Sequence, residues 1–424
     1  MRKEKRRNCM KKILIVGASL SGNVDGPAIL DTFIENIQEL TPDVSFTMLS
    51  KYPKDDLPLC KKKGIQGYSF TTIYQLIVGS LFFVLGSLRK LLGLPPALKL
   101  MPKQIREYYE NDICVDLTGI SFSDDRPFSS LVINTLWLLN TKVSGIPTVK
   151  TANSMGPFRK WYVRIVGKWV LKDISVLVAR GDVSYQLVKE LLPSKEIYNL
   201  PDIAFGLEPA EKERISALLN KHGLEESNYA VIGPSYVMNR LLGQENNLKI
   251  YTKMVSVIKG QEPDIKILLV PHSRKHSTTL GVDDVSDDCD ICRLLKGELE
   301  KKGIHAEILD EILNPHEVKG VIGAARYAIG SRYHLLIAAL SSATPCMALG
   351  WNHKYEEAFQ LFNCSEWVIR HEETSEDMIA ESTLCFIESV SEIQRRIERT
   401  LPEVVEKAKK NATLVYEMME RKNQ

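Results

Sequence analysis

The stretch KKILIVGASLSGNVDGPAILDTFIENIQEL, residues 11–40, says most about the fold class. Ile13 to Val16 are four consecutive apolar residues, which is typical of a buried strand. A glycine-rich loop follows, and from Pro27 the apolar residues recur at helical spacing, with the proline near the first turn, where a helix tolerates it. The stretch therefore predicts a strand, a loop and a helix, the unit from which parallel α/β sheets are built.

The same alternation of strands and helices recurs along most of the chain. Further short strands are predicted at residues 44–49, 113–117, 148–151 and 176–179 and, after a charged linker, at 229–232, 267–270, 306–309 and 327–329. Segments with helical spacing of apolar residues separate these strands, which favours parallel sheets covered by helices. We therefore predict an α/β chain of two Rossmann-like, doubly wound domains that face a cleft.

Changes in composition along the chain predict the domain boundaries. These are a basic N-terminal extension at 1–11, a first Rossmann-like domain at 12–207 that includes an apolar segment at 65–94, a linker helix at 208–228, a second Rossmann-like domain at 229–370 and C-terminal helices at 371–424. In doubly wound sheets, ligands bind beyond the carboxyl ends of the strands. We therefore expect the functional residues in the loops that follow the strands.

The overall composition limits the class of protein. The 424 residues suffice for two or three domains, and 55 Lys and Arg against 53 Asp and Glu leave a formal charge of only +2. This balance argues against a disordered chain and against a nucleic-acid partner. The eight cysteines are scattered, which favours free thiols in a reducing compartment. The basic N-terminus precedes an apolar run too short for a secretion signal, so we expect a cytoplasmic protein.

The apolar segment does not fit the alternating pattern. Residues 65–88 contain no charged side chain and are followed by Arg89 and Lys90, which is close to the length needed to span a bilayer. Polar side chains and three glycines among these residues argue against a span. Three interpretations remain open: a buried or surface-seated helix, a helix in peripheral contact with the inner face of the membrane, and a membrane-spanning helix.

The sequence YAIGSRYHLLIAALSSATPCMALGWNHKYEEAFQLF, residues 327–362, carries the strongest chemical signal. A strand ends at Gly330, and Ser331, Arg332 and His334 stand at the entry of an apolar helix. A helix N-terminus attracts anions, and an arginine there adds a planar fork that matches phosphate or carboxylate. The pattern predicts an anionic ligand. Lys354, in the next loop, either reaches the same anion or lies on the surface, and His334 taken alone is also compatible with a core histidine.

This stretch resembles the C-terminal signature of the polysaccharide pyruvyl transferase family, which runs Gly-x-Arg-x-His, an apolar helix, a proline-containing strand and a late lysine. Further matches occur in the order in which the family has them. They are NSMGPF at 153–158, VLVARGDVS at 176–184, NLPDIAF at 199–205 and LLVPHS at 268–273. The resemblance covers about residues 12 to 370.

The resemblance implies a GT-B type fold and transfer of pyruvate from phosphoenolpyruvate to two sugar hydroxyls, which forms a ketal without a redox cofactor or a metal. It implies His334, Arg332 and Arg180 as catalytic residues, Ser331, His272 and Lys354 as donor-binding residues, and Asn23, Asp25, Gly119 and Ser154 as acceptor-binding residues on the N-terminal domain. The first loop departs from the family's Asn-x-Gly-Asp order. A simple Asx turn at Asn23 therefore remains an equal interpretation.

Two patterns suggest metal sites. His272 and His276, followed by Cys289 and Cys292, have the ligand types and local spacings of a zinc site in reverse order. The motif Asp288-x-Asp290 resembles a pair of metal-binding carboxylates, but it falls in a run of acidic residues. We interpret that run as a solvated acidic loop and predict no metal.

The expected function is pyruvyl transfer onto a cell-envelope or exopolysaccharide precursor. Its partners would be phosphoenolpyruvate and a glycan or lipid-linked sugar acceptor, in the cytoplasm or at the inner face of the membrane. One alternative is a nucleotide-sugar glycosyltransferase of the same GT-B architecture. Another is a non-catalytic, membrane-associated binding protein of this fold.

Overall fold

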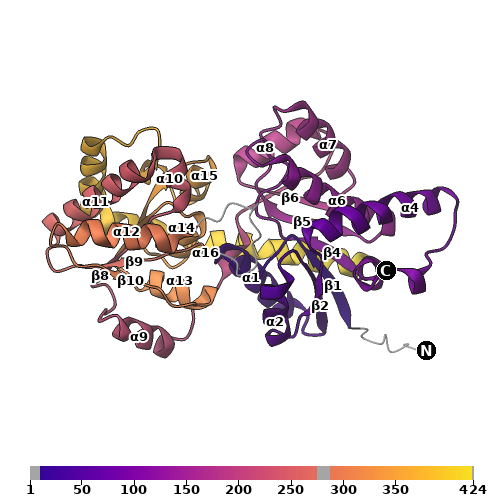
Figure 1. Ribbon diagram of the computed structural model, residues 1–424, viewed down its shortest axis with the longest axis horizontal. Helices are drawn as coiled ribbons and strands as arrows, with labels where there is room; N and C mark the ends of the chain where they lie inside the picture. The colour runs from indigo at the N-terminus through magenta and orange to yellow at the C-terminus, as the bar shows by residue number, and fades with distance from the viewer. Residues whose placement is uncertain (1–9, 275–286, 423–424) are drawn as a thin grey trace. The chain divides into compact units, whose positions relative to one another are not determined.

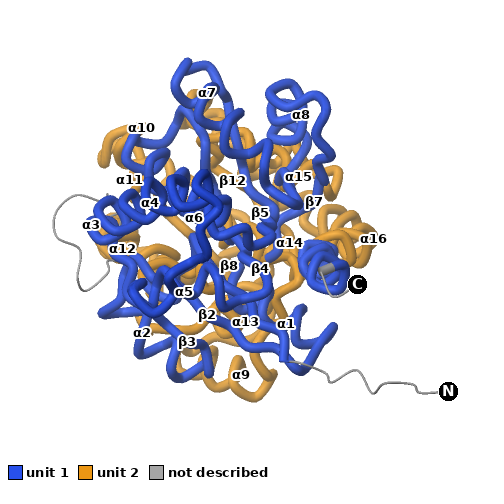
Figure 2. The backbone as a smooth tube through the Cα atoms, turned by 90° about the vertical axis from the view of Figure 1, so that its right-hand side faces the viewer, with its two compact units in different colours: residues 1–21, 29–203, 409–424 blue, residues 22–28, 204–408 orange. Residues whose placement is uncertain are grey.

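The computed structural model describes residues 10–274 and 287–422, which form two compact units. Within these residues, the first unit comprises 10–21, 29–203 and 409–422, and the second comprises 22–28, 204–274 and 287–408 (Figure 2). The predicted first domain, 12–207, was continuous. In the structure, residues 22–28 belong to the second unit, and the end of the C-terminal helix belongs to the first.

The first unit is built on a seven-stranded parallel sheet in the order β3-β2-β1-β4-β5-β6-β7 (Figure 1). Its strands are β1 (Lys11–Val16), β2 (Val44–Ser50), β3 (Gln66–Ser69), β4 (Ile113–Asp116), β5 (Thr148–Asn153), β6 (Val176–Arg180) and β7 (Tyr198–Leu200). The chain starts in the middle of the sheet and winds outward in both directions, which is the Rossmann-like arrangement predicted from the sequence.

The second unit repeats this arrangement with a six-stranded parallel sheet in the order β10-β9-β8-β11-β12-β13. Its strands are β8 (Tyr229–Gly233), β9 (Lys266–Leu269), β10 (Glu307–Ile308), β11 (Tyr327–Gly330), β12 (Cys346–Gly350) and β13 (Val368–Arg370). The strands predicted from apolar runs are thus confirmed. The prediction missed β3, β7 and β13, which have only three or four residues each.

Helices connect the strands of both sheets (Figure 1). The helices from α1 to α8 are α1 (Asp25–Leu40), α2 (Pro53–Lys62), α3 (Thr72–Tyr74), α4 (Ser80–Leu91), α5 (Lys103–Glu110), α6 (Phe128–Ser144), α7 (Trp161–Leu171) and α8 (Asp182–Leu191). Those from α9 onward are α9 (Lys212–Lys221), α10 (Tyr236–Leu242), α11 (Gln244–Gln261), α12 (Asp288–Glu300), α13 (Pro315–Gly323), α14 (Tyr333–Leu340), α15 (Lys354–Gln360) and α16 (Glu376–Lys422). A π-helical turn, Gln75–Gly79, joins α3 to α4.

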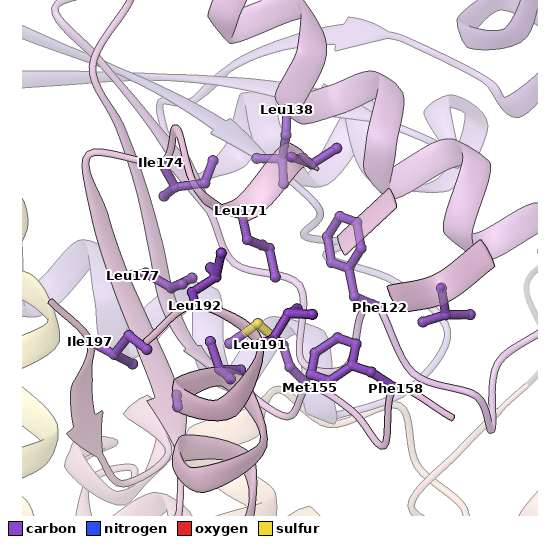
Figure 3. Packing of buried hydrophobic residues seen from close by; sticks show 14 of the residues in the cluster. Phe122, Leu138, Met155, Phe158, Leu171, Ile174, Leu177, Leu191, Leu192 and Ile197 are labelled. Carbon is purple, nitrogen blue, oxygen red and sulfur yellow. The ribbon is translucent and has the colours of Figure 1, made fainter. Parts of the chain in front are cut away.

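The core of each unit lies between its sheet and its helices. In the first unit, one cluster joins Phe122, Met155 and Phe158 of the loops to Leu171 and Leu177 of α7 and β6 (Figure 3). Burying large apolar side chains of this kind contributes roughly 1.5–3 kcal/mol each to folding. These packed sheets hold the strand ends, and the loops that follow them, in place.

Candidate functional site

The loop of residues 22–28 is held on the second unit by backbone contacts. Val24 N–H donates to the carbonyl of His272 over 3.2 Å, and Arg274 N–H donates to the carbonyl of Gly22 over 3.0 Å. Asn23 pairs with Ser273 in a short antiparallel bridge. The prediction had assigned this loop to the N-terminal domain. Its strand-like pairing with the segment after β9 instead brings the start of α1 to the second unit.

Asn23 forms a local turn at the start of α1. Its side-chain oxygen accepts a hydrogen bond of 3.2 Å from the backbone N–H of Gly26, and the residue is exposed. The bond reaches three residues along the chain, as a helix-capping bond does, so Asn23 has a local structural role at the helix entry without forming the two-residue Asx turn. It places Asp25 in the first turn of α1.

Asp25 lies against two histidines from different parts of the second unit. Its Oδ1 atom is 3.1 Å from Nε2 of His272, in the loop after β9, and 3.2 Å from Nδ1 of His334, in the first turn of α14. The side chains of His272 and His334 are only 2% and 8% exposed, whereas that of Asp25 is 30% exposed. The three residues are separated by about 250 and 60 positions in sequence, so only the fold brings them together.

The electrostatics of this group favour an ionised carboxylate. Burial opposes the charge on Asp25, but the adjacent imidazoles of His334 and His272 outweigh it and hold the pKa of the carboxyl well below its usual range. A carboxylate beside two imidazoles fixes their orientation. The arrangement therefore places an ionised carboxylate against two buried imidazoles, the side chains that most often serve as general acids and bases.

Arg332 is held by a buried carboxylate at the entry of α14. Its Nε and Nη2 atoms donate to the two oxygens of Asp288 over 2.8 and 2.7 Å, a bidentate pair. Burial disfavours the charge of Arg332, but Asp288 outweighs it and the pKa of the guanidinium is raised. The pair fixes Arg332 in the strand-like entry that precedes the helix.

The interpretation of Asp288 as part of a solvated acidic loop is wrong. Its side chain is 0% exposed and also accepts hydrogen bonds from the backbone N–H groups of Tyr236 and Ser273. A buried carboxylate needs partners of this kind, and the fold supplies them from three segments. Most of the predicted acidic loop lies outside the described residues, because residues 275–286 are not among them.

Ser331 and Lys354 are two further buried residues of the second unit, close to the entry of α14. The buried Ser331 hydroxyl accepts a hydrogen bond of 2.8 Å from Tyr251, and its carbonyl accepts one of 2.8 Å from Tyr355. The buried Lys354 ammonium is 4.7 to 5.5 Å from the ring centroids of Trp351, Tyr333 and Tyr355. Cation–π contacts stabilise a desolvated ammonium. Lys354 is therefore a buried cation of the second unit and does not lie on its surface.

The sequence analysis missed Lys319 of α13. This buried lysine lines a small pocket of the second unit together with His272 and His334. Burial lowers the pKa of its ammonium to about 8, and its Nζ donates to the carbonyl of Leu207. One signal was present: Lys319 stands within the apolar part of α13, between Val318 and the Gly-Val-Ile run that follows, an unusual position for a charged side chain.

The remaining candidate residues form a separate group in the first unit. Ser154 N–H donates to the carbonyl of Gly119 over 3.1 Å, and the Ser154 hydroxyl accepts bonds of 3.1 and 3.0 Å from Nε and Nη2 of Arg180. Arg180 also forms a buried ion pair with Asp202. The structure thus joins Gly119, Ser154 and Arg180 in one unit, and Asp25, His272, Arg332 and His334 in the other.

The suggested zinc ligands are only partly within the described residues, because His276 lies outside them. Cys289 and Cys292 are buried free thiols in α12. Burial raises the pKa of Cys289 to about 11 and that of Cys292 well above its usual value, so both stay protonated at neutral pH. Among residues 10–274 and 287–422, no group of three His, Cys, Asp or Glu side chains is placed to hold a metal ion.

Two Rossmann-like units with parallel sheets define a two-domain α/β protein of the GT-B type. Within that class, the chain belongs to the polysaccharide pyruvyl transferase family, whose model matches residues 28–353. The match confirms the resemblance seen in the sequence.

Individual relatives agree with this assignment. The amylovoran biosynthesis protein AmsJ of Erwinia amylovora is 20% identical over 417 residues, which cover 92% of this chain and 95% of AmsJ. Two solved structures share the fold. Anabaena HepE in complex with UDP and glucose has a TM-score of 0.57 and 14% identity, covering 97% of this chain and 100% of that one. The Neisseria meningitidis UDP-GlcNAc 2-epimerase bound to UDP-GlcNAc has a TM-score of 0.59 and 10% identity, with the same coverage.

Proposed function

We propose that this protein transfers pyruvate from phosphoenolpyruvate to two hydroxyls of a sugar in an exopolysaccharide or cell-envelope precursor, as a ketal. The observation that carries the proposal is the contact of Asp25 with both His272 and His334. Ketal formation needs groups that both give and take protons near neutral pH, and this trio can do so. The family and the exopolysaccharide role of AmsJ support the general function.

The proposed reaction moves protons from two sugar hydroxyls to the methylene carbon of phosphoenolpyruvate and to the departing phosphate. The methylene carbon of phosphoenolpyruvate gains one proton and becomes a methyl group, while the first sugar hydroxyl loses its proton and bonds to the adjacent carbon. The second hydroxyl then loses its proton and bonds to the same carbon as the C–O bond to phosphate breaks. Phosphate leaves with one proton, so the protons lost by the two hydroxyls equal those gained by the methyl group and phosphate.

In this proposal His334 is the catalytic acid and base. His272 binds the donor and assists the departure of phosphate. Asp25 is a positioning residue that holds both imidazoles, rather than the acceptor-binding residue expected from the sequence. No step in this scheme requires a metal or a redox cofactor.

The donor carries a phosphate and a carboxylate, so its site needs several cations and hydrogen-bond donors. We propose that Arg332, Lys354 and the Ser331 segment supply them in the second unit. Nε and Nη2 of Arg332 already donate hydrogen bonds to Asp288. The anion would therefore bind to the remaining N–H groups of the Arg332 guanidinium. We propose Arg180 as the catalytic cation of the first unit. For the sugar acceptor, the proposed binding residues are still Asn23, Gly119 and Ser154.

Release of inorganic phosphate from phosphoenolpyruvate, in the presence of sugar precursors with neighbouring hydroxyls, tests the activity. We expect release only with a suitable acceptor, and a loss of at least ~100-fold for His334→Ala. The matched control is His305→Ala, because His305 is exposed and pairs with Glu307 two residues further along. Equal activity of His334→Ala and the control would remove His334 from the mechanism.

A nucleotide-sugar glycosyltransferase is the second candidate function. It is favoured by one observation, the UDP and UDP-sugar complexes of the structural neighbours. Thermal-shift measurements separate the two, because a ligand that binds the folded state raises its melting temperature. Stabilisation by phosphoenolpyruvate supports the proposal, and stabilisation by UDP alone supports the glycosyltransferase. Binding of phosphoenolpyruvate without release of its phosphate in the presence of any acceptor would indicate a binding protein.

We further propose that the acceptor is lipid-linked and that the enzyme works in the cytoplasm, in peripheral contact with the membrane. Sugar precursors on lipid carriers are exposed at a bilayer surface, so an enzyme held there would meet them at high local concentration. Comparing phosphate release with a lipid-linked acceptor in vesicles and with its water-soluble headgroup tests this. A higher rate with the soluble headgroup would contradict it.

A further inference from the structure

The helical stretch Thr72–Leu91 has one buried and one exposed face. It is the one stretch among the described residues that is long and apolar enough to cross a membrane, and only 22% of its most apolar window is buried. Its exposed apolar residues are Ile73, Leu76, Ile77, Leu81, Val84, Leu85, Leu88 and Leu91. They recur at helical spacing and form a continuous stripe, with Ile77 for example 64% exposed. A patch of this kind usually marks an interaction surface.

The opposite face of the stretch is fixed to the first unit. Gln75, Gly79, Phe82 and Gly86 are buried, and the Gln75 side chain donates to the carbonyl of Ile133 over 2.9 Å. A Cβ atom on Gly86 would lie 2.2 Å from Cγ1 of Val143, so α4 packs closely on α6. Because one face is committed to the protein core, the stretch suits a helix that lies along a surface rather than one that crosses a bilayer.

Helix α7 extends the exposed face of α4. Phe83 of α4 makes an edge-on contact with Trp169 of α7, with ring centroids 6.2 Å apart. Trp161, Ile165 and Trp169 recur every four residues and are all exposed, Trp161 by 72%. Tryptophan is the side chain most typical of the membrane–water interface, since its ring is apolar and its N–H is polar. We call the exposed apolar residues of Thr72–Leu91 and α7 together the α4–α7 face.

The charge around the α4–α7 face is predominantly positive, with Asp173 just after the end of α7 as an acidic neighbour paired with Lys142. Residues 57–106 and residues 126–172 contain no Asp or Glu, and each stretch contains eight Lys and Arg. Those that are exposed or half-exposed near α4 and α7 are Arg89, Lys90, Lys99, Lys103, Arg159, Lys160, Arg164, Lys168 and Lys172. The basic side chains Arg164 and Lys168 of α7, and Lys172 directly after it, also recur every four residues, and the first two stand directly before Ile165 and Trp169. A chain of net charge +2 thus concentrates positive charge around its most apolar surface.

We propose that the α4–α7 face docks onto an anionic lipid bilayer, with both helices lying in the plane of the interface. The apolar side chains would enter the region between headgroups and acyl chains, and the Lys and Arg side chains would contact anionic headgroups. Charge selects this occupant over a second copy of the chain, because pairing two such faces would bring like charges together. The docking rests on neither phosphoenolpyruvate nor sugar chemistry, so it extends the proposed function without depending on it.

Sedimentation of the full chain with vesicles tests the proposal. We expect binding to vesicles of 30% phosphatidylglycerol and 70% phosphatidylethanolamine, weaker binding as salt is raised, and little binding to pure phosphatidylcholine. The variant Ile77→Ser/Leu81→Ser/Leu85→Ser removes apolar contacts, and Arg164→Glu/Lys168→Glu reverses two charges. Each should weaken binding at least ~10-fold. All five substituted side chains are exposed, so we expect both variants to fold. Their melting temperatures check this.

The control variant Lys212→Glu/Lys302→Glu makes the same charge change at exposed positions of the second unit. It should bind vesicles as the unaltered protein does. If the control and the Arg164→Glu/Lys168→Glu variant lost vesicle binding equally, net charge alone would explain the loss. That result would contradict docking through the α4–α7 face. The proposal is also overturned if the unaltered protein fails to bind anionic vesicles, or if it is a dimer that the Ile77, Leu81 and Leu85 substitutions dissociate. None of these outcomes depends on phosphate release, so they stand apart from the test of the proposed activity.

Discussion

Asp25 shows how one side chain acquires a role from residues far away in sequence. It stands in a glycine-rich loop whose own sequence suggests only a turn, yet its carboxylate contacts His272 and His334. Because those imidazoles hold the pKa of Asp25 well below its usual range, the carboxylate stays charged throughout the neutral range. The residue is therefore a counter-charge for two histidines.

Replacing Asp25 by Asn should reduce phosphate release at least ~100-fold, because the imidazoles lose the charge that orients them. A positioning role also predicts that the pH dependence of activity changes, because the variant lacks the charge that Asp25 carries beside both imidazoles throughout the neutral range. A pH–rate profile of the variant checks this. An unchanged profile with lower activity would indicate a purely structural role.

Asp25→Asn should also change how the free energy of unfolding depends on pH. A carboxyl whose pKa is depressed in the folded state stabilises that state above its unfolded pKa of about 4, and the contribution is lost as pH falls through the folded value. The unaltered protein should therefore lose stability below pH 4 more steeply than Asp25→Asn. Urea unfolding between pH 2.5 and 6 measures this difference, and parallel curves would contradict it.

Asp288 and Asp290 offer a comparison within one helical turn. Asp288→Ala leaves the guanidinium of Arg332 buried without its bidentate partner, which should cost about 3–5 kcal/mol in the free energy of unfolding. Asp290 is more than half exposed, so Asp290→Ala should change stability by less than ~0.5 kcal/mol. Chemical denaturation distinguishes the two. Similar values for both variants would mean that Asp288 is not a structural partner of Arg332.

At the scale of elements, the close packing of α4 on α6 depends on a glycine at the contact between the two helices. The glycine at position 86 lets the two helices approach, and the buried residues Phe82 and Val143 then join one hydrophobic cluster with Trp137. The close approach keeps the other face of α4 exposed, so packing on one side creates the surface on the other.

Gly86→Val should destabilise the first unit by about 1–3 kcal/mol, because its Cβ would meet Val143 at 2.2 Å. Val143→Ala should restore part of this loss in the double variant, which a double-mutant cycle detects. Gly297 of α12 is the control, since within residues 10–274 and 287–422 nothing outside its chain neighbours and its own helix backbone lies within 4 Å of an added Cβ. Gly297→Ala should stabilise the protein by about 0.5–1 kcal/mol. A destabilising effect at both glycines would point to the helix backbone and not to packing.

At the scale of the whole molecule, each unit is assembled from separate parts of the chain. Residues 409–422 of α16 return to the first unit, where the buried Asn411 accepts a hydrogen bond of 2.9 Å from the N–H of Ala152 in β5. Its side chain also donates to the carbonyl of Pro201 over 3.4 Å. The C-terminus is therefore part of the structure of the N-terminal sheet.

Asn411→Leu should leave the N–H of Ala152 buried without a partner and cost about 1–3 kcal/mol. Hydrogen exchange should accelerate in β5 and not in β8 to β13, because the bond lies within the first unit. The exposed neighbour Lys410 provides the control, and Lys410→Ala should change neither region. Equal acceleration in both sheets would contradict a local role for Asn411.

Much of the fold followed from local pattern. Apolar runs such as Ile13 to Val16 predict buried strands, and the order of strands and helices predicts the Rossmann-like sheets. The Arg332 and His334 motif predicts a charged helix entry for the same reason, because neighbouring residues suffice to define it. The short strand β3 escaped prediction, since it gains its place by pairing with β2 and not from its own composition.

By itself, the sequence determined the alternation of elements, the two sheets and the family, because these depend on residues close together along the chain. Only the tertiary structure decided that Asp25 meets His272 and His334, that Asp288 is buried against Arg332, and that α4 and α7 present one apolar, basic face. The physical reason is that ionisation, desolvation and exposure depend on neighbours in space. Here those neighbours come from segments tens to hundreds of residues apart.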